Sequence, residues 1–508
     1  MPVSPTNLLT SLDPVGDAAY NTGPRANSKC FQGTRVDIVN EICLWAYHPS
    51  DRRIAWLHGP AGFGKSAVAR TLADQWDQSN RLLGSFFFFR NSGEQSKAAR
   101  LLPTLAYQLT FSMPGTKPSI ERALRKHPFL LKQPVEKQFQ KLIVDPIAAL
   151  PNLPPHPWVI VIDGVDECDN LELISQFIHA ITSLDLSRFP VLFFFSSRLE
   201  RRIQGILHSP TTRAIIHQFS LLDFNANKDI QSFLKAQFTF IHDSNPRLMR
   251  HIPRPWPSSS DLKYIVRLVN GSFVFAAALA KYVRDGNPPP IRLVPIVRNI
   301  TGIDDMYKEI LSPLWEKNRF QIVFSTIMLL KKPLSIIELE SLLQLDSRDI
   351  TSDLLYIQSI VTVPDDDSAK VEIVHTSLRD FSTSLERSGV FYADTAENHF
   401  QLAISCLQVM STTAPQGVVF EEDAAAYASI YWLEHLHLVL QRPGSLPAEC
   451  DPLTEKLTIF ISRAFDAWFT TMMLRKDGES NLDLLYRIIE QANVSQPLVD
   501  ASLINRRL

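Results

Sequence analysis

A glycine-rich run behind a short apolar stretch limits the folds open to this chain more than any other feature of its sequence. Residues 59 to 66 read Gly-Pro-Ala-Gly-Phe-Gly-Lys-Ser and fit the pattern G-x-x-x-x-G-K-[ST] over its whole length. The apolar segment 54–58 precedes the run, and the helical pattern of residues 66–76 follows it. The sequence therefore predicts a buried strand, a tight loop and a helix, in that order.

The residue types in this run suit a phosphate group. Its glycines let successive backbone N–H groups turn toward one anion, and the N-terminus of the next helix adds partial positive charge. Lys65 is expected to reach the β- and γ-phosphates, and the Ser66 hydroxyl is expected to bind Mg²⁺. A structural turn rich in glycine is the alternative. The predicted nucleotide contacts are Gly59, Gly62, Gly64, Lys65, Ser66 and Ala67.

A group of acids follows another apolar segment further along the chain. Residues 158–162 are apolar and run into Asp-Gly-Val-Asp-Glu. A carboxylate at the end of a strand can organise the same metal, so Asp163 is predicted to hold Mg²⁺ through water. Asp166 or Glu167, on the turn beyond, is expected to orient or deprotonate the attacking water. Three acids this close repel one another, and a bound cation offsets that repulsion. A solvated acidic loop is the alternative.

An arginine completes the set of candidate catalytic residues. The apolar segment 191–195 is followed by Ser-Ser-Arg, so Arg198 should project from the same edge of a parallel sheet as Asp163. A guanidinium stays charged and can bind a γ-phosphate with two hydrogen bonds. We predict that Arg198 detects the γ-phosphate, and an ordinary surface arginine is the alternative.

The remaining patterns indicate several domains. Between Arg53 and about Phe238, short apolar runs alternate with helical stretches, which is typical of a parallel sheet with helices on both faces. Three later helices and a hairpin, with a capping box at Ser335 and Glu338, suggest a winged helix. The expected parts are a lead-in (1–30), an α/β P-loop NTPase core (31–245), a helical domain (258–312), a winged-helix domain (313–390) and a C-terminal helical region (391–508).

Composition and charge exclude several classes of protein. Lys and Arg number 51 against 53 Asp and Glu, so a net charge of −2 leaves no bulk basic field for nucleic acid. The candidate recognition helix of the winged helix carries Arg348 against Asp349 and Asp353, which also argues against DNA binding. Five scattered cysteines suggest neither a disulfide framework nor a zinc site. Because no long apolar run is found, we expect a cytoplasmic protein without a membrane span.

Together these motifs resemble a NACHT-type STAND NTPase of the nephrocystin-like branch that is abundant in fungal NLR-like signalling proteins. The similarity extends to Gly271–Ala276, to Ile303–Leu311 and to His375–Phe381, and in all it covers about 31–436. It implies a switch governed by ADP and ATP, in which His375 of the winged helix faces the nucleotide in the closed state. From the residues alone, a single histidine after an apolar strand is more often a core or interface residue, so both interpretations stay open.

Three functions remain open at this point. The first is a signalling NTPase that hydrolyses ATP slowly and self-associates on activation. The second is a nucleotide-bound scaffold or decoy that hydrolyses nothing, and the third is a constitutive motor. Adenine is the expected base, because residues 227–229 lack the spacing of a guanine-reading N-K-x-D set, and Phe31–Thr34 is expected on the base side. Effector or sensor proteins are expected as partner chains, because neither kind of domain is visible in the sequence.

Overall fold

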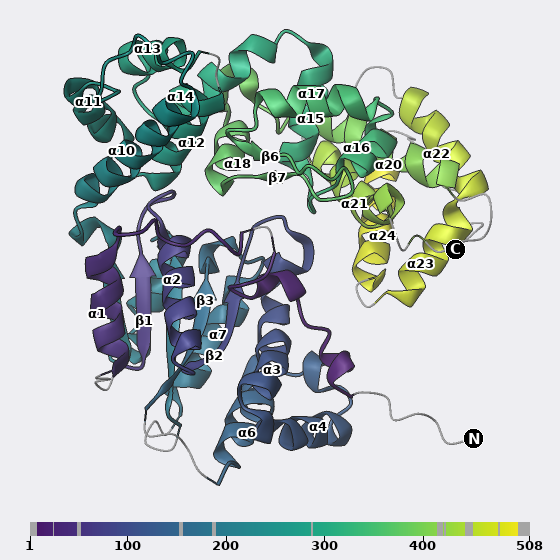
Figure 1. Cartoon of the computed structure of the whole chain (residues 1–508). Helices are drawn as coiled ribbons and strands as arrows, with labels where there is room; N and C mark the ends of the chain where they lie inside the picture. The colour runs from purple at the N-terminus through teal and green to yellow at the C-terminus, as the bar shows by residue number, and fades with distance from the viewer. Residues whose placement is uncertain are drawn as a thin grey trace. The chain divides into compact units, whose positions relative to one another are not determined.

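The computed structural model describes residues 8–23, 25–47, 52–151, 156–184, 189–285, 288–413, 420, 423–441, 451–475 and 478–495. The chain divides into two compact units, Met1–Ile300 and Thr301–Leu508 (Figure 1). The finer boundaries expected from the sequence stay predictions. The last thirteen positions of the expected C-terminal region, 496–508, lie outside the described residues.

The first unit is built on a parallel sheet of five strands in the order β2-β3-β4-β1-β5 (Figure 1). The α/β P-loop fold class predicted from the sequence is therefore confirmed. Four of the five strands are almost entirely buried, because helices cover both faces of the sheet and leave little room for polar side chains. The strands are β1 (Ile54–His58), β2 (Leu82–Phe87), β3 (Trp158–Asp163), β4 (Val191–Ser197) and β5 (Ile216–Ser220).

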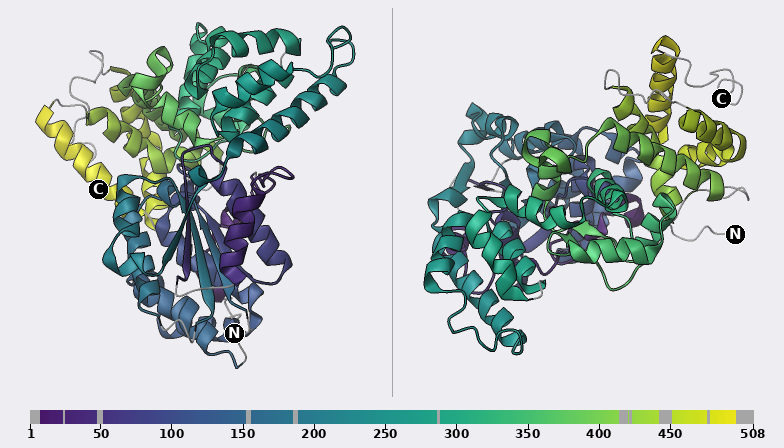
Figure 2. Two further views of the ribbon diagram at one scale, coloured as in Figure 1. Left: turned by 90° about the vertical axis from the view of Figure 1, so that its left-hand side faces the viewer. Right: turned by 90° about the horizontal axis from the view of Figure 1, so that it is seen from above.

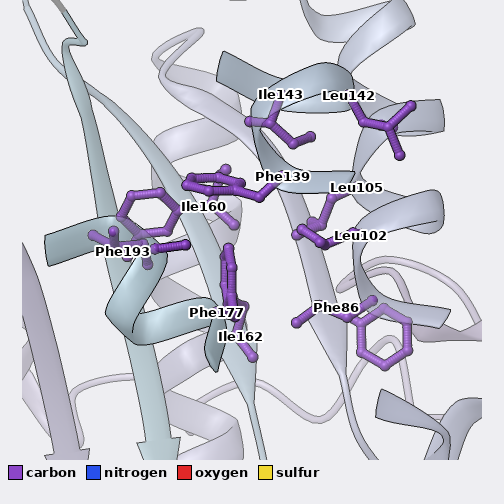
Figure 3. Packing of buried hydrophobic residues seen from close by; sticks show 14 of the residues in the cluster. Phe86, Leu102, Leu105, Phe139, Leu142, Ile143, Ile160, Ile162, Phe177 and Phe193 are labelled. Atoms are coloured by element: carbon purple, nitrogen blue, oxygen red, sulfur yellow. The ribbon is translucent and has the colours of Figure 1, made fainter. Parts of the chain in front are cut away.

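Figure 2 shows helices on both sides of the sheet. Alternating side chains of each strand enter two separate cores, one on each face of the sheet. One core holds α1 (Val36–Tyr47) and α2 (Lys65–Gln78), and the other holds α3 (Leu101–Ser112) and α7 (Leu171–Thr182). Figure 3 shows aromatic rings of the second core, where Phe177 packs 5.8 Å from Phe193 between ring centroids. The α7 helix is thus fixed directly against the strand whose end carries Arg198.

The remaining helices of the first unit surround this sheet or extend beyond it. Helices α11 and α12 are separated at Asn270 and Gly271, which both take left-handed backbone angles, as predicted from this Asn-Gly pair. The bounds are α4 (Lys117–Lys126), α5 (Val135–Phe139), α6 (Asp145–Ala148), α8 (Arg201–Leu207), α9 (Pro210–Arg213), α10 (Ala226–Ser244), α11 (Ser259–Val269), α12 (Phe273–Asp285) and α13 (Pro289–Asn299).

The described part of the lead-in packs onto the first unit. Leu9, Leu12 and Ala18 are buried in the same core as α3. The Tyr20 N–H donates to Ser85 Oγ over 2.9 Å, which attaches the lead-in to the edge strand β2. These contacts make residues 8–20 part of the structure that supports the sheet.

The second unit is mostly helical. Between residues 313 and 375, three helices are followed by an antiparallel pair of short strands, in the order predicted, and the predicted capping box is present at Ser335 and Glu338. The winged-helix assignment stays an interpretation of that order. Arg319 is paired with Asp349 and Asp353 of α17. The elements are α14 (Ile303–Leu311), α15 (Asn318–Leu329), α16 (Ile336–Leu343), α17 (Ser347–Tyr356), β6 (Val361–Thr362), β7 (Glu372–Ile373), α18 (Thr376–Ser382), α19 (Leu385–Ser388), α20 (Ala396–Thr413), α21 (Asp423–Leu440), α22 (Asp451–Arg463), α23 (Phe465–Leu474) and α24 (Gly478–Ser495).

The sequence predicts that no helix of this chain crosses a membrane. Among the helices in the described residues, none combines the length and the apolar character that crossing a membrane requires.

Candidate nucleotide site

The glycine-rich loop joins the end of β1 to the start of α2. Gly62 has φ of 79° and Gly64 has φ of 92°, in the left-handed region that glycine adopts without strain. A Cβ atom at Gly62 would also lie 2.8 Å from Ser272 Oγ, so a side chain there has no room. Because Gly64 is the N-cap and carries no side chain, the first N–H groups of α2 have no cap from their own loop. They are available to an anion.

Lys65 folds back over the loop in this structure. Its Nζ donates to the carbonyl oxygens of Gly59 and Pro60, each over 2.9 Å. Burial lowers the pKa of Lys65, while the charge of Asp166 and the smaller effect of Asp163 raise it. The ammonium therefore lies within electrostatic range of the acids that follow β3. Lys65 and Asp163, far apart in the sequence, belong to one site.

Asp163 is buried, and two serine hydroxyl groups lie beside it. Ser196 donates a hydrogen bond to its carboxylate, and Ser66 lies close enough to lower its pKa. Burial raises the pKa of Asp163, and the charge of Arg70 and the two serine hydroxyl groups oppose that rise. The predicted metal-binding groups, the Ser66 hydroxyl and the Asp163 carboxylate, thus lie close together. Both are oxygen ligands of the kind that Mg²⁺ takes, and a cation would offset the cost of burying the carboxylate.

Few carboxylate, imidazole or thiolate groups among the described residues surround Ser66 and Asp163. No group of three or more His, Cys, Asp or Glu side chains among the described residues is placed to hold a metal. Mg²⁺ usually keeps several waters and binds through one or two carboxylates together with substrate phosphates. The sparse donor set of Ser66 and Asp163 fits that manner of binding.

The order of the strands places β4 between the glycine-rich loop and the acids. Ser196 and Ser197 at its end therefore lie between β1 and β3. Ser197 Oγ accepts the indole N–H of Trp56 over 2.9 Å, and Ser196 Oγ accepts the Gly164 N–H over 3.3 Å. Neither serine was predicted from the sequence to be a site residue. The only signal was a polar pair at the end of an apolar strand.

Arg198 and Asp166 are bound to each other. The Arg198 N–H donates to Asp166 Oδ1 over 2.9 Å, and its Nε lies 3.1 Å from Asp166 Oδ2. The Asp166 side chain is only 2% exposed. Arg198 does lie at the predicted edge of the sheet. Its guanidinium is held by Asp166, although Asp166 was predicted to act separately, on the attacking water. Asp166 is therefore committed to this ion pair.

Glu167 has a different environment. Burial, reinforced by the charge of Asp166, raises the pKa of Glu167 to about 7. Its Oε2 accepts the Arg90 N–H over 3.1 Å, and Arg90 Nη2 donates to the Asp166 carbonyl over 3.0 Å. No role was predicted for Arg90 from the sequence. Its position did indicate one, because Arg90 is the first charged residue after the apolar strand β2.

The expected base side of the site lies at the start of α1. Arg35, next to the Phe31–Thr34 segment, donates from Nη2 to the Phe63 carbonyl of the glycine-rich loop over 2.8 Å. Its N–H donates to Asp229 Oδ2 over 2.8 Å, and its guanidinium lies 5.1 Å from the Phe273 ring centroid. Arg35 was missed by the sequence analysis. That Phe31–Thr34 contacts a base stays a prediction.

The turn before α12 and the first residues of α12 pack onto the same loop. The Val274 N–H donates to the Gly62 carbonyl over 3.2 Å. A Cβ atom at Gly271 would lie 2.7 Å from the Phe63 ring. Residues 271–274 thus support the loop from outside the sheet.

Two predicted contacts remain to be placed. Ala67 lies half-buried in the first turn of α2, beside Ser66. His375 belongs to the second unit, where it is the N-cap of α18 and its Nδ1 accepts the Ser377 N–H over 3.0 Å. This bond gives His375 a structural role within its own unit. That it also faces the nucleotide stays a prediction.

A family match begins at Arg35 and ends at Arg198, two residues that contact the site. Residues 35–198 match the family model of nephrocystin 3, N-terminal. This segment is therefore similar to the N-terminal part of nephrocystin 3. The resemblance predicted from the sequence is confirmed for these residues. The nephrocystin-like domain includes the glycine-rich loop, the acids and strands β1 to β4.

Solved structures similar to the chain are distant. They include a STAND protein with a tetratricopeptide repeat sensor from Pyrococcus horikoshii, at 11% identity and a TM-score of 0.47, covering 93% of this chain and 59% of that one. Cdc6p from Pyrobaculum aerophilum has 14% identity and a TM-score of 0.31, covering 71% and 93%. Drosophila ORC bound to GC-rich DNA and Cdc6 has 12% identity and a TM-score of 0.26, covering 92% and 69%. No curated protein matches the chain.

Proposed function

We propose that the chain is a nucleotide-dependent switch that binds ATP or ADP with Mg²⁺ in its nephrocystin-like domain and hydrolyses ATP slowly. One observation carries this proposal. The Lys65 ammonium and the Ser66 hydroxyl, at the start of α2, lie close enough to the buried Asp163 carboxylate at the end of β3 to lower its pKa. Groups suited to phosphate and to a hard cation then face the same triphosphate.

Each group has a distinct task in the proposed reaction. The N–H groups at the start of α2 bind phosphate oxygens, and Lys65 exchanges the carbonyls of Gly59 and Pro60 for β- and γ-phosphate oxygens. Ser66 and Asp163 would hold Mg²⁺, Asp163 through water. When bound, Mg²⁺ neutralises charge on the phosphate oxygens.

Glu167 is the better candidate for the general base. A base is most effective when its pKa is close to the working pH, and the pKa of Glu167 is about 7. Asp166 is already paired with Arg198. We therefore assign proton removal from water to Glu167. Asp166 holds Arg198 beside the γ-phosphate, where the guanidinium adds positive charge.

These groups can supply the difference in binding free energy that such a switch requires. Moving an equilibrium from about 1:99 to 99:1 needs about 5.5 kcal/mol of differential binding. Hydrogen bonds to charged groups contribute about 1.5–3 kcal/mol each. Lys65, Arg198 and the metal held by Ser66 and Asp163 supply enough such bonds to separate an ATP state from an ADP state. In an NLR-like pathway of immunity or incompatibility, the ATP state would self-associate and recruit effector or sensor proteins.

The decisive experiment measures both the mass of the assembly and the rate of ATP hydrolysis. Light scattering of the full chain with ADP and with a non-hydrolysable ATP analogue should give a larger assembly only with the analogue. Slow release of phosphate from ATP should be lost in Glu167→Gln, while nucleotide binding persists. Failure of the wild-type chain to bind any purine nucleotide refutes the proposal. Binding without turnover or assembly would instead indicate a nucleotide-stabilised scaffold or decoy.

A further inference from the structure

The segment that follows β2 runs along the acid turn, which we define as residues 163–167. The Phe88 N–H donates to the Asp163 carbonyl over 2.9 Å, continuing the pairing of β2 with β3. A Cβ atom at Gly164 would lie 2.9 Å from the Phe88 carbonyl oxygen. The two segments are therefore too close to move independently.

Arg90 lies two residues further on and contacts the acid turn twice. Its main-chain N–H donates to the Glu167 carboxylate over 3.1 Å, and its guanidinium donates to the Asp166 carbonyl over 3.0 Å. The Glu167 N–H itself closes the turn onto the Gly164 carbonyl over 2.8 Å. One residue thus holds both the side chain of Glu167 and the backbone that carries it.

The loop that carries Arg90 is fixed at its other end as well. The Asp169 N–H donates to the Ser96 carbonyl, and the Ala98 N–H donates to Asp169 Oδ1, each over 2.8 Å. The Gln95 side chain donates to the Phe87 carbonyl over 2.9 Å. Because the loop is held on both sides of Arg90, the guanidinium is pre-placed against the turn. Such outer contacts keep catalytic side chains in their working geometry.

We propose that Arg90 is a positioning residue for ATP hydrolysis, which fixes the acid turn so that the Glu167 carboxylate is oriented to take a proton from the attacking water. The inference rests on the proposed function, because only a hydrolysing chain activates a water. Arg90 acts through Glu167, and its two contacts above are both with protein atoms of the turn.

The first test separates binding from chemistry in the full chain. Arg90→Ala should lower the single-turnover rate of ATP hydrolysis by about ten- to hundredfold, while the Kd for a fluorescent ATP analogue changes by less than about twofold. Arg90→Lys should restore part of the rate, because an ammonium can still donate to the Asp166 carbonyl. Lys97→Ala is the matched control. Lys97 is on the same loop and pairs with Glu94 over 2.7 Å.

A double substitution tests whether Arg90 acts through Glu167. In a Glu167→Gln background, Arg90→Ala should lower the residual rate by less than about twofold, because the group that it positions is already disabled. Full additivity of the two losses would overturn the inference. So would a loss of nucleotide affinity above about tenfold in Arg90→Ala, which would indicate direct contact with the ligand.

Amide hydrogen exchange checks the geometry without turnover. Arg90→Ala should speed exchange of the amides in residues 164–168 by at least about tenfold, and Lys97→Ala should leave them unchanged. Unchanged exchange in Arg90→Ala overturns the inference. A wild-type chain that does not hydrolyse ATP refutes the proposed function and the inference together, whereas a hydrolysing wild type with a fully active Arg90→Ala variant refutes the inference alone.

Discussion

The hydroxyl of Ser66 lies close enough to the carboxylate of Asp163 to lower its pKa. Ser66 lies in the first turn of α2, which follows β1, while Asp163 ends β3, and β4 lies between β1 and β3. This proximity therefore depends on the order of the strands and on how far each extends. It places two oxygen ligands where a magnesium-bound phosphate would be held.

This proximity predicts how Ser66→Ala affects binding. The variant should weaken binding of Mg²⁺-ATP by at least about tenfold, equivalent to about 1.4 kcal/mol, because one metal ligand is lost. Binding of ADP without Mg²⁺ should change by less than about twofold, since the backbone contacts to phosphate remain. Titration calorimetry with and without Mg²⁺ measures both. Equal losses in the two conditions would rule out a metal-binding role for Ser66.

Lys65 should determine whether nucleotide stabilises the fold. A ligand at a hundred times its Kd adds about 2.7 kcal/mol to the free energy of unfolding. Lys65→Ala should abolish most of the ATP-dependent rise in Tm, because the ammonium that pairs with the phosphates is gone. Thermal melts with and without ATP give the readout, and Lys97→Ala is the control. A full ATP-dependent shift in Lys65→Ala would remove Lys65 from the site.

The raised pKa of Glu167 predicts a pH dependence of hydrolysis. A general base acts only when it is deprotonated, so kcat/KM should fall as pH decreases through about 7. Below that pH the slope should approach about tenfold per unit. Initial rates in a constant-ionic-strength buffer series measure the profile. Glu167→Gln should lack this acidic limb, and retention of the limb in that variant would assign it to another group.

Local patterns made the P-loop and the strands predictable. Phosphate binding by the Gly59–Ser66 loop requires certain residues at fixed spacing, and buried strands require apolar residues. Both can therefore be recognised in the sequence before the fold is known. The sheet edge shared by Lys65, Asp163 and Arg198 followed from parallel strands alone.

The detailed pairing of the site was not predictable in the same way. Asp166 and Arg198 were expected to act separately, and their ion pair depends on β4 lying beside β3. Arg90 contacts the acid turn only because β2 is the other neighbour of β3. Arg35 reaches the loop from the position just before α1, which precedes β1. Each contact joins segments whose pairing the sequence does not state.

Gln108 completes the open edge of the sheet. Strand β2 is an edge strand, and the Gln108 side chain of α3 accepts the Ser85 N–H over 2.7 Å and donates to the Ser85 carbonyl over 2.9 Å. The amide therefore pairs with the edge as a neighbouring strand would, which protects it from other chains. Gln108→Ala should lower the free energy of unfolding by about 1–3 kcal/mol, because both Ser85 backbone groups lose their partner.

Urea denaturation measures this loss, with Gln78→Ala as the control. Gln78 is an exposed helical glutamine bound to Asp74 over 3.1 Å, so its removal should cost less than about 0.5 kcal/mol. The Gln108→Ala variant should also aggregate at lower urea concentration than the wild type does. Equal stability of the two variants would show that the edge contact contributes little.

Two buried histidines in the second unit form a single line of hydrogen bonds. His399 Nε2 lies 2.8 Å from Asp394 Oδ1, His399 Nδ1 lies 3.0 Å from His435 Nδ1, and His435 Nε2 lies 2.9 Å from the Tyr427 hydroxyl. A carboxylate only accepts, so a neutral His399 donates from Nε2 and accepts at Nδ1. His435 must then donate from Nδ1 and accept the Tyr427 hydroxyl at Nε2. The line is complete only while His435 is neutral.

This arrangement predicts that acid destabilises the second unit. Burial, with the charges of His399 and Lys331, holds the pKa of His435 well below its usual value. The unfolded chain therefore binds a proton at His435 that the folded chain does not, so stability is present above about pH 6.5 and is lost as pH falls below it. Calorimetric Tm values between pH 7.5 and 5 should show a smaller acid-induced decrease for His435→Gln than for the wild type. His251→Gln, at an exposed position, should behave as the wild type does, and an unchanged decrease in His435→Gln would refute this origin of the acid sensitivity.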